Sequence, residues 1–424
     1  MTKEVKKANE NPTGIGDSAL WVLTKISWLN VWRSKKRSLI IITAVIIGLW
    51  SGIFLLAFYN GMVQQRVNSA IANELSHLQL HHPEFRKEFE IKYGIPEGTR
   101  SLQQIQSLPE VRHAAGRIII KGMIASASGS SGISINGIMP EAEDSLTGLA
   151  GKIKTGKYFN AQKSNEILVS EKTLQKLKLK LKNKVILTFQ DTEGNLASGA
   201  FRIIGTFKTI SIPYDDTNVF INVKDAASLS ALGNQFSEIA ILLKSNESLA
   251  TVQQVLQQQF PTLEVKNWTE LSPEIAMTES VSDQMVFIFM GIILLALSFG
   301  IINTMLMAVL ERTREIGMLL ALGMNRLKVF SMIMMETFFL VFAGCPFGIL
   351  LALATIAITH RTGIQLQVFA DMGSNFGYED VVYPSLATKQ FVTILILIIL
   401  TAVLSALFPA QRAVRLNPSE SLRK

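Results

Sequence analysis

Residues 39–59 read LIIITAVIIGLWSGIFLLAFY, a stretch without a single charged side chain. A helix rises about 1.5 Å per residue, so about 20 apolar residues cross the hydrocarbon core of a bilayer. Three further stretches have the same character: residues 285–310, residues 329–358, which only Glu336 interrupts, and residues 391–408. The sequence therefore predicts an α-helical membrane protein with four transmembrane helices.

Composition supports this class. The chain has 424 residues, of which 48% are hydrophobic and 17% are charged, with a net charge of +8. Soluble domains carry roughly 25% charged residues, so an ordinary soluble enzyme is disfavoured. The one cysteine, Cys345, excludes a disulfide-stapled scaffold and any cysteine-rich metal site, because both need at least two thiols.

Lysine and arginine counts in the flanking segments predict the orientation, because basic residues resist translocation. Residues 1–38 hold eight, the loop 311–328 holds four and the tail 409–424 holds four, whereas the loop 359–390 holds two. We therefore expect both termini in the cytoplasm, residues 60–284 as one large domain on the far side of the membrane, and residues 359–390 as a short loop on that same side.

The large outer segment has mixed α/β patterns. Strands are predicted at residues 77–81, 117–124 and 132–138, and a hairpin joins 185–189 to 201–207 through the polar loop 191–199. Helices are predicted at residues 101–108, 171–177 and 249–260, where apolar side chains recur at spacings of three and four. The sequence therefore predicts a mixed α/β extracytoplasmic domain between the first and second transmembrane helices.

Several segments resemble those of one family. They are ERTREIGMLLALGMNRLKVFSMIMMETFFL at 311–340, FPAQRAVRLNPSESLRK at 408–424, WLNVWRSKKRSL at 28–39, SHLQLHHPEF at 76–85, SINGIMPEAED at 134–144 and NEILVSEKTLQKLKLKLKNKVIL at 165–187. Together they resemble the MacB/FtsX-like permeases of ABC transporters, and the layout is similar to that of the lipoprotein-releasing (LolC/LolE-type) permeases. The resemblance covers essentially the whole chain.

The resemblance implies a non-catalytic permease of the bacterial inner membrane that works by mechanotransmission. ATP and Mg would be bound by a partner ABC ATPase dimer, since the chain has no G-x-x-x-x-G-K-[ST] motif, and this chain would bind no cofactor and no nucleic acid. It further implies a second permease copy, identical or paralogous, contact with membrane lipid, and a periplasmic carrier or outer-membrane component as a further partner.

The loop 311–328 is the expected ATPase contact. Its charged residues stand beside apolar residues, so it is amphipathic and suits a groove of a soluble partner, although a charged turn that only fixes topology has the same composition. The resemblance implies that this loop and the helix before the first span meet the ATPase. The coupling residues it implies are Glu311, Arg312, Arg314, Glu315 and Gly317.

Four other side chains stand out around the membrane. Trp21, Trp28 and Trp32 fall on one helical face, which predicts an anchor at the membrane interface within the helix of residues 1–38, and ATPase contact is compatible with it. Glu336 lies inside the third span, where an isolated carboxylate costs about 2.5–3.5 kcal/mol on insertion scales. We expect structural pairing for Glu336, with coupling and proton transfer as less favoured roles.

Two polar clusters in the outer domain invite other interpretations. His77 and His81 share a face of the predicted strand but lie about 13 Å apart, so we expect a partly exposed strand and no metal site. Six lysines recur in residues 172–184, which favours a solvated helix–turn face, although such a run can also attract anionic head groups.

The sequence is compatible with two classes of substrate. The resemblance is compatible with release of lipoproteins from the inner membrane and with MacB-like export of peptides or small molecules. In lipoprotein-releasing permeases one subunit presents an extended hairpin that captures the carrier, and here the corresponding loop 191–199 is nine residues long. MacB-type permeases usually carry a fused ATPase domain, which this chain lacks. A membrane signalling protein with a large sensor domain is the alternative outside transport.

Overall fold

The computed structural model describes residues 17–160, 163–366, 378, 381–386 and 388–415. The first 16 residues, residues 367–377, 379–380 and 387 of the predicted loop 359–390, and the end of the predicted tail 409–424 lie outside this part. The described chain divides into two compact units, a helical unit and a mixed α/β unit. The helical unit holds residues up to 61, 283–363 and 383 onward, and the α/β unit holds residues 62–282 and 364–382.

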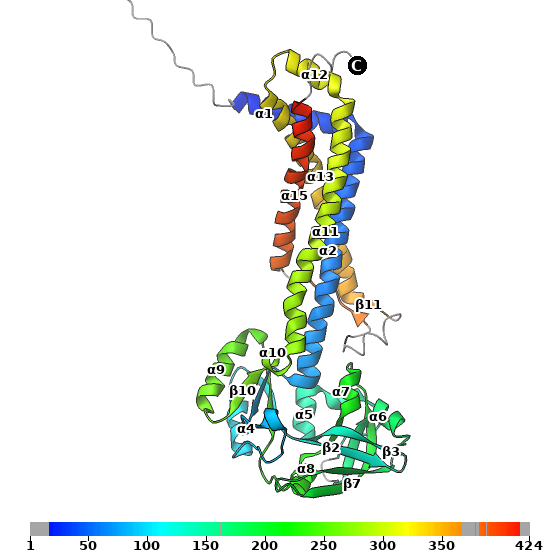
Figure 1. The fold of residues 1–424 in the computed structure, drawn as a ribbon, viewed down its shortest axis with the longest axis vertical. Helices are drawn as coiled ribbons and strands as arrows, with labels where there is room; N and C mark the ends of the chain where they lie inside the picture. The colour runs from blue at the N-terminus through cyan, green and yellow to red at the C-terminus, as the bar shows by residue number, and fades with distance from the viewer. Residues whose placement is uncertain (1–16, 161–162, 367–377, 379–380, 387, 416–424) are drawn as a thin grey trace, which may run out of the picture. The chain divides into compact units, whose positions relative to one another are not determined.

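Long apolar helices build the helical unit (Figure 1). Within the described residues, four helical stretches have the length and hydropathy needed to cross a membrane, namely Lys35–Leu75, Pro273–Glu311, Arg326–Thr362 and Gln390–Val414. Each extends beyond the apolar run seen in the sequence, because polar residues continue the helix on either side. The helices are α1 (Asp17–Arg33), α2 (Lys35–Ala70), α11 (Pro273–Glu311), α12 (Thr313–Ala321), α13 (Arg326–Thr362) and α15 (Thr388–Val414).

Glycines allow α2 and α13 to pack closely. A Cβ atom built on Gly348 would lie 2.8 Å from Leu49 Cβ, and one on Gly344 would lie 3.0 Å from Val45 Cγ1. Small residues spaced by four on one helix are typical of tight contacts between membrane helices. Polar pairs add to this packing: Trp50 donates to Thr355 at 3.0 Å between α2 and α13.

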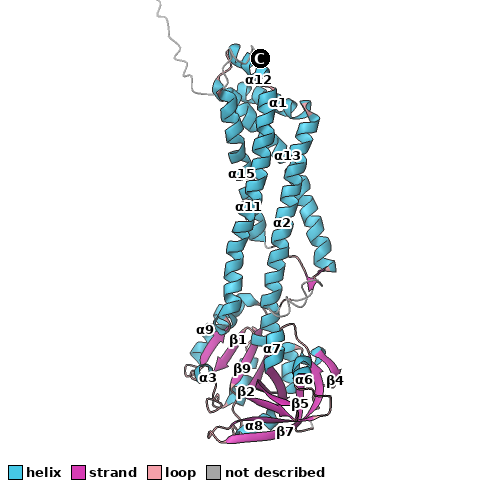
Figure 2. Ribbon diagram, turned by 45° about the vertical axis from the view of Figure 1, so that its right-hand side comes forward, coloured by secondary structure: helices cyan, strands magenta, loops and turns pink. Residues whose placement is uncertain are grey.

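A ten-stranded mixed sheet forms the centre of the α/β unit (Figure 2). Its order is β10-β1-β9-β2-β3-β8-β5-β7-β4, and β6 pairs with both β2 and β7. The strands are β1 (Leu78–His81), β2 (Val111–Ser126), β3 (Gly129–Ile138), β4 (Ile153–Gly156), β5 (Glu166–Ser170), β6 (Lys184–Gln190), β7 (Leu196–Phe207), β8 (Asn218–Asn222), β9 (Glu238–Leu243) and β10 (Glu264–Asn267). A separate pair joins β11 (Ile364–Gln365) to β12 (Val381–Val382).

Short helices pack around this sheet, and a single cluster of buried Ile, Leu, Val and Phe side chains forms the main core. The helices are α3 (Phe85–Glu88), α4 (Gly98–Gln106), α5 (Pro140–Thr147), α6 (Glu171–Lys176), α7 (Ile212–Thr217), α8 (Val223–Ser230), α9 (Leu249–Gln259) and α10 (Trp268–Leu271). The single-turn elements are η1 (Ile71–Leu75), a π-helix, and the 3₁₀ turns η2 (Leu149–Lys152) and η3 (Asn246–Ser248). The architecture confirms the predicted fold class, because this α/β unit lies between the first and second long helices in chain order.

Two local expectations for the α/β unit need correction. The strand predicted at residues 77–81 is buried from Leu78 to His81 rather than partly exposed, because β1 is an inner strand between β10 and β9, and only His77 before it is half-buried. The predicted hairpin forms, but its loop is five residues rather than nine, since β7 already begins at Leu196. Asp191 closes this turn by accepting hydrogen bonds from the backbone of Glu193 and Asn195, both at 2.9 Å.

Candidate functional site

Six charged side chains meet at the end of the helical unit where α12 lies. We call them the arginine–glutamate cluster: Arg33, Arg37, Glu311, Arg312, Glu315 and Glu336. Three cations face three anions, so the formal charges cancel within the cluster. The members come from α1, α2, α11, α13 and the α12 segment, and the cluster therefore joins elements that are far apart in the sequence.

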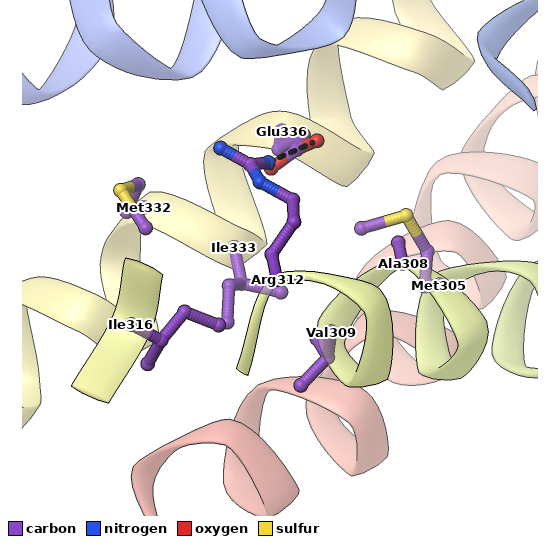
Figure 3. A pocket seen from close by; sticks show the side chains of 8 residues that line it. All are labelled: Met305, Ala308, Val309, Arg312, Ile316, Met332, Ile333 and Glu336. Carbon is purple, nitrogen blue, oxygen red and sulfur yellow. Dashed lines mark hydrogen bonds and ion pairs between the residues drawn. The ribbon is translucent and has the colours of Figure 1, made fainter. Parts of the chain in front are cut away.

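The inner pair of the cluster is Arg312 with Glu336 (Figure 3). Arg312 is the residue between α11 and α12, and its backbone leaves the helical conformation there, with φ −104° and ψ 18°. Its guanidinium Nη1 lies 3.2 Å from Glu336 Oε2 and its Nε lies 3.1 Å from Glu315 Oε2. The Glu336 side chain is only 5% exposed, so this carboxylate within α13 is paired and not in contact with lipid.

Apolar side chains surround the inner pair. A cavity of about 10 Å³ beside it is lined by Met305, Ala308, Val309, Ile316, Met332 and Ile333 together with the two charged residues. Such a volume holds about one water molecule. The arrangement therefore fits a structural ion pair, and the cavity is too small for a substrate or cofactor.

The outer pairs of the cluster connect α1 to α12 and the start of α2 to the end of α11. Arg33, the last residue of α1, donates to Glu315, and Arg37 Nη1 lies 2.9 Å from Glu311 Oε2. Burial alone would raise the pKa of Glu315, but the hydrogen bonds from Arg33 and Arg312 hold that pKa below its usual range. Glu315 is therefore ionised at neutral pH and attracts both arginines.

Helix α1 is also packed along α13. Ser27 Oγ donates to the Met332 carbonyl at 3.1 Å, and the Trp28 ring meets Phe339 edge-on with centroids 5.4 Å apart. Trp21, Trp28 and Trp32 keep much of their surface exposed, which suits the predicted interfacial anchor. Helix α1 is therefore joined to α13 by packing, in addition to the ion pair that joins it to α12.

The structure divides the five predicted coupling residues. Arg312 and Gly317 face the helices and are largely covered, Glu311 and Glu315 are held in ion pairs, and Arg314 is on the exposed side of α12. Sequence reasoning missed Arg33 and Arg37 as partners of the loop, since basic residues before a span also serve as a topology signal.

Exposed apolar side chains lie on α12, on the turn after it and at the start of α13, beside the exposed polar residues Arg314, Asn325 and Arg326. Leu322 is 85% exposed, Met318 is 50% exposed and Leu327 is 68% exposed. Leu322 follows Met318 by four residues, which puts the two on one side of a helix. We call these three residues the α12 face. In the sequence, this surface was indicated by the amphipathic pattern of the loop rather than by its charges.

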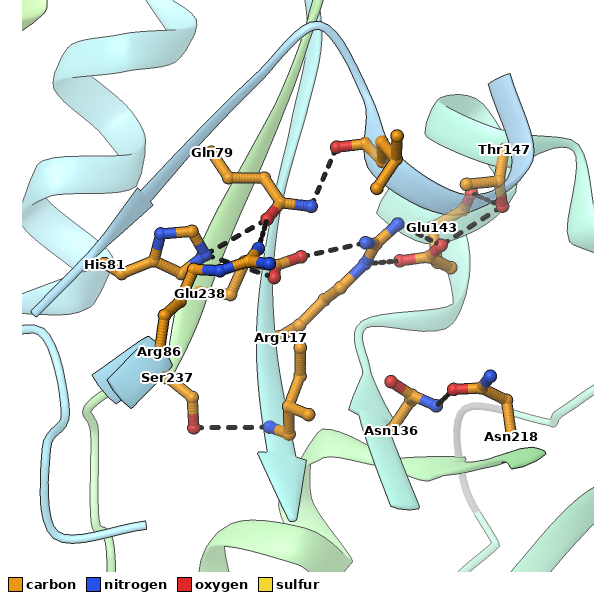
Figure 4. A network of polar contacts seen from close by, with 12 residues as sticks. Gln79, His81, Arg86, Arg117, Asn136, Glu143, Thr147, Asn218, Ser237 and Glu238 are labelled. Atoms are coloured by element: carbon orange, nitrogen blue, oxygen red, sulfur yellow. Dashed lines mark hydrogen bonds and ion pairs between the residues drawn. The ribbon is translucent and has the colours of Figure 1, made fainter. Parts of the chain in front are cut away.

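A second polar network lies inside the α/β unit (Figure 4). Arg117 on β2 binds Glu143 of α5 in a bidentate manner at 2.8 and 2.7 Å, and its third nitrogen lies 2.9 Å from Glu238 on β9. Although burial alone would raise it, the pKa of Glu238 stays below its usual range because His81 and Arg117 hydrogen-bond its carboxylate. His81 Nε2 is 3.4 Å from Glu238 Oε2, so this histidine is committed to the network.

The same network also binds the backbone at the two points where the chain enters and leaves the sheet. Gln79 donates to the Leu75 carbonyl at the end of η1, and Arg86 donates to the Leu271 carbonyl at the end of α10. The roots of α2 and α11 also share an apolar cluster of Val67, Ala70, Ile71, Trp268 and Ile275. Within the described residues, no group of three or more histidine, cysteine or acidic side chains is arranged to hold a metal ion.

Comparisons with known proteins match the chain along most of its length. The model of the MacB-like periplasmic core domain matches residues 38–259, which is 222 of 424 residues, and the model of the FtsX-like permease C-terminal region matches residues 287–418. The solved periplasmic region of MacB from Actinobacillus actinomycetemcomitans is 12% identical, with a TM-score of 0.35, over 52% of this chain and 98% of that one.

Two relatives illustrate the range of the matches. An uncharacterised ABC transporter permease of Methanocaldococcus jannaschii is 28% identical over 53% of this chain, and the chain spans about half of that protein, 55%. The lipoprotein-releasing system transmembrane protein LolC of Neisseria meningitidis is 21% identical over 92% of this chain and 96% of that protein.

Proposed function

The chain belongs to the MacB/FtsX-like family of ABC transporter permeases, and from this premise we propose that it couples ATP hydrolysis by a partner ATPase to movement of its periplasmic domain. The family is typically non-catalytic, and the sequence carries no phosphate-binding loop. ATP and Mg would therefore be bound by an ABC ATPase dimer, and the permease would transmit force.

The observation that carries this proposal is the arginine–glutamate cluster behind the α12 face. A partner that pushes on Met318 and Leu322 would move α12, and the ion pairs of Glu315 and Arg312 that tie this segment to α1 and α13 would move with it. Exposed apolar side chains on a short helix fit a groove on a soluble protein. We assign this face to the ATPase contact, with Arg314 beside it.

The network in the periplasmic domain supports the second half of the mechanism. Gln79 binds the Leu75 carbonyl at the end of η1, and Arg86 binds the Leu271 carbonyl at the end of α10, which are the two roots where the domain joins α2 and α11. A shift of either root would therefore displace β1 and, through Glu238 and Arg117, β9 and β2. Buried, fully paired charges resist independent movement of their elements. The sheet would therefore move with the roots as one body.

The proposal includes an orientation and an assembly. The α12 end, residues 1–38 and the tail 409–424 would lie in the cytoplasm of a bacterium, with the spans in the inner membrane. Four spans are few for a wide path, so a second permease copy, identical or paralogous, would complete the transporter.

A direct experiment tests the docking surface. Leu322→Glu together with Met318→Glu should reduce co-purification of the ATPase by at least tenfold. Two apolar side chains that become buried in an interface together typically contribute more than about 1.4 kcal/mol of binding free energy. Leu196→Glu, an equally exposed leucine in the periplasmic domain, should leave co-purification unchanged. Retention of the ATPase by the α12 variant would refute the assignment.

For the substrate we favour lipoprotein release from the inner membrane. The support is the similarity to LolC, which extends over 92% of the chain. Mass spectrometry of the detergent-solubilised complex decides this point by identifying both protein subunits and bound lipidated species. An ABC ATPase with triacylated lipoprotein would support the extractor, and a preparation without any ATPase would contradict a transport function.

Export of peptides or small molecules, with an outer-membrane component as partner, is the second candidate. The tight five-residue turn between β6 and β7 favours it, because this hairpin offers no extended loop to capture a periplasmic carrier. An ATPase recovered without lipoprotein in the same mass spectrometry experiment would support this candidate over the first.

A further inference from the structure

One strongly charged surface of the periplasmic domain has no part in the proposed coupling. Residues 152–184 contain ten lysines and only two acidic residues. Five of the lysines alternate with other residues between the end of α6 and the start of β6, and all five are exposed. We call them the lysine loop: Lys176, Lys178, Lys180, Lys182 and Lys184.

The lysine loop is held in one conformation by its own backbone and by the core. Leu177 and Leu179, between the lysines, are buried in the main apolar cluster. Lys182 N donates to the Ile203 carbonyl of β7 at 2.8 Å, and Lys180 N donates to the Asn183 side chain at 2.7 Å. The lysine Cα atoms are thus fixed, and the loop presents its charges as a constant array next to α6, which packs beside β5 (Figure 2).

These lysines are not used to stabilise the fold. Lysines elsewhere in the domain do pair with glutamates, as Lys87, Lys92 and Lys266 show. By contrast, within the described part of the chain none of the five lysines of the loop forms an ion pair. Their mutual repulsion is therefore not offset by acidic side chains.

Two of the lysines also occupy unfavourable backbone positions. Lys178 has φ +52° and Lys182 has φ +70°, in the left-handed region that glycine or asparagine adopts with less strain. Residues held in such conformations are often functional, because another requirement outweighs the strain. At both positions the residue is lysine rather than glycine, so each strained position adds one positive charge to the lysine loop.

We propose that the lysine loop binds the phosphate-bearing head groups of an anionic phospholipid surface. Clusters of four to eight basic residues are known for binding anionic lipid at the cytoplasmic leaflet, and the same electrostatic attraction, about 1 kcal/mol for each basic residue, acts at any anionic lipid surface. Interfaces with proteins are depleted in lysine and enriched in aromatic residues and arginine, and the loop has neither type. Lysine carries a compact charge on a flexible stem, which suits many mobile phosphates.

The test uses the full chain in nanodiscs of zwitterionic phosphatidylcholine, floated with separate vesicles. Vesicles that contain about one third phosphatidylglycerol should bind in about 0.1 M salt and release in about 1 M salt, where the Debye length falls from about 10 Å to about 3 Å. Pure phosphatidylcholine vesicles should not bind. Absence of binding to the anionic vesicles would overturn the proposal.

The decisive variant is Lys178→Gly with Lys182→Gly, which removes two charges and relieves both strained positions. Binding should fall about 30-fold, the equivalent of two lysines at about 1 kcal/mol each, while the melting temperature of the domain should not decrease. Reduced binding then cannot be attributed to unfolding. The basic N-terminal segment is the same in every variant, so it does not affect the comparison.

A matched control removes two exposed lysines elsewhere in the domain, Lys224→Gln with Lys244→Gln. It should keep wild-type binding, and an equal loss in both variants would overturn the proposal because net charge alone would explain it. If crosslinking at Lys180 in cells captures an acidic protein and no lipid binding is measured, the loop belongs to a protein contact and the lipid proposal is wrong.

Discussion

Arg312 and Glu336 are 24 residues apart in the chain, yet a guanidinium nitrogen of the first lies 3.2 Å from a carboxylate oxygen of the second. The pair connects the junction of α11 and α12 to the buried side of α13. The position of α12 is thereby linked to a transmembrane helix through a charge that lipid cannot solvate. Separation of this pair is costly in a low-dielectric environment, so we expect α12 and α13 to move together.

Loss of the inner pair should destabilise the helical unit. We expect Arg312→Met to lower the free energy of unfolding by about 2–4 kcal/mol, because Glu336 is left buried with only the more distant Arg37, at 3.9 Å. Denaturation in mixed micelles measures this change. The reversed pair, Arg312→Glu with Glu336→Arg, should recover part of the loss, and Arg361→Met at the other end of α13 should have no effect.

Coupling can be separated from stability at the outer pair of the cluster. Arg33 and Glu315 are 59% and 38% exposed, so their ion pair contributes about 1 kcal/mol or less to folding. Arg33→Glu, which leaves the Glu315–Arg312 pair in place, should therefore leave the protein folded but raise ATP hydrolysis without transport in reconstituted vesicles. Arg33→Lys, which keeps the charge, should keep transport; unchanged transport in Arg33→Glu would refute a coupling role.

Close packing between α2 and α13 should be sensitive to a single methyl group. Gly348→Ala places a Cβ atom 2.8 Å from Leu49 Cβ, so the helices must separate, at a typical cost of about 1–3 kcal/mol. Thermal unfolding in detergent measures this loss. Gly300→Ala on α11, where the new methyl meets no atom within 4 Å, is the matched control and should be neutral or slightly stabilising.

The membrane helices and the order of the domains could be predicted from the sequence, because an uncharged apolar stretch of membrane length rarely forms any other structure. The β6–β7 hairpin was also predictable from alternation and turn residues. The burial of β1 was not, since the inner position of a strand depends on pairing with β9 and β10, which follow β1 only at the far end of the domain.

The candidate site was predictable only in outline. The loop 311–328 stood out through its charges, but Arg312 and Glu315 are held in ion pairs within the protein, and the exposed apolar surface of α12 is formed by Met318 and Leu322. Arg33 and Arg37 lie 282 and 274 residues before their partners, so no local pattern could connect them. The direction of each side chain follows from helix packing, which a single sequence does not reveal.

The buried network of the periplasmic domain should be essential for its stability. Glu143→Gln removes one charge from the bidentate pair in which the Arg117 and Glu143 side chains are only 7% and 2% exposed. A loss of about 1.5–3 kcal/mol is expected, because the neutral amide accepts only one of the two hydrogen bonds from Arg117, while Glu238 at 2.9 Å still balances the guanidinium charge. Pulse proteolysis of the full chain measures it. Glu97→Gln, which breaks the exposed pair with Arg100, should cost less than about 1 kcal/mol.

A pH dependence should arise at Lys152, which donates to Asn73 of η1 and to the Thr147 carbonyl of α5. Burial lowers the pKa of Lys152 from 10.5 to about 8. Between pH 8 and 10.5 the unfolded chain then holds a proton that the folded chain has released, so the free energy of unfolding rises with pH through this window. Below pH 8 both states are protonated and this contribution is constant.

Pulse proteolysis of the periplasmic domain at a series of pH values measures the slope. Lys152→Met should flatten it, because the titrating group is gone, whereas Lys154→Met, two residues along and exposed, should keep it. The comparison between these two variants cancels the titration of all other groups. A slope that persists unchanged in Lys152→Met would show that another residue titrates, and Lys152 would then be an ordinary charged lysine that hydrogen-bonds η1 and α5.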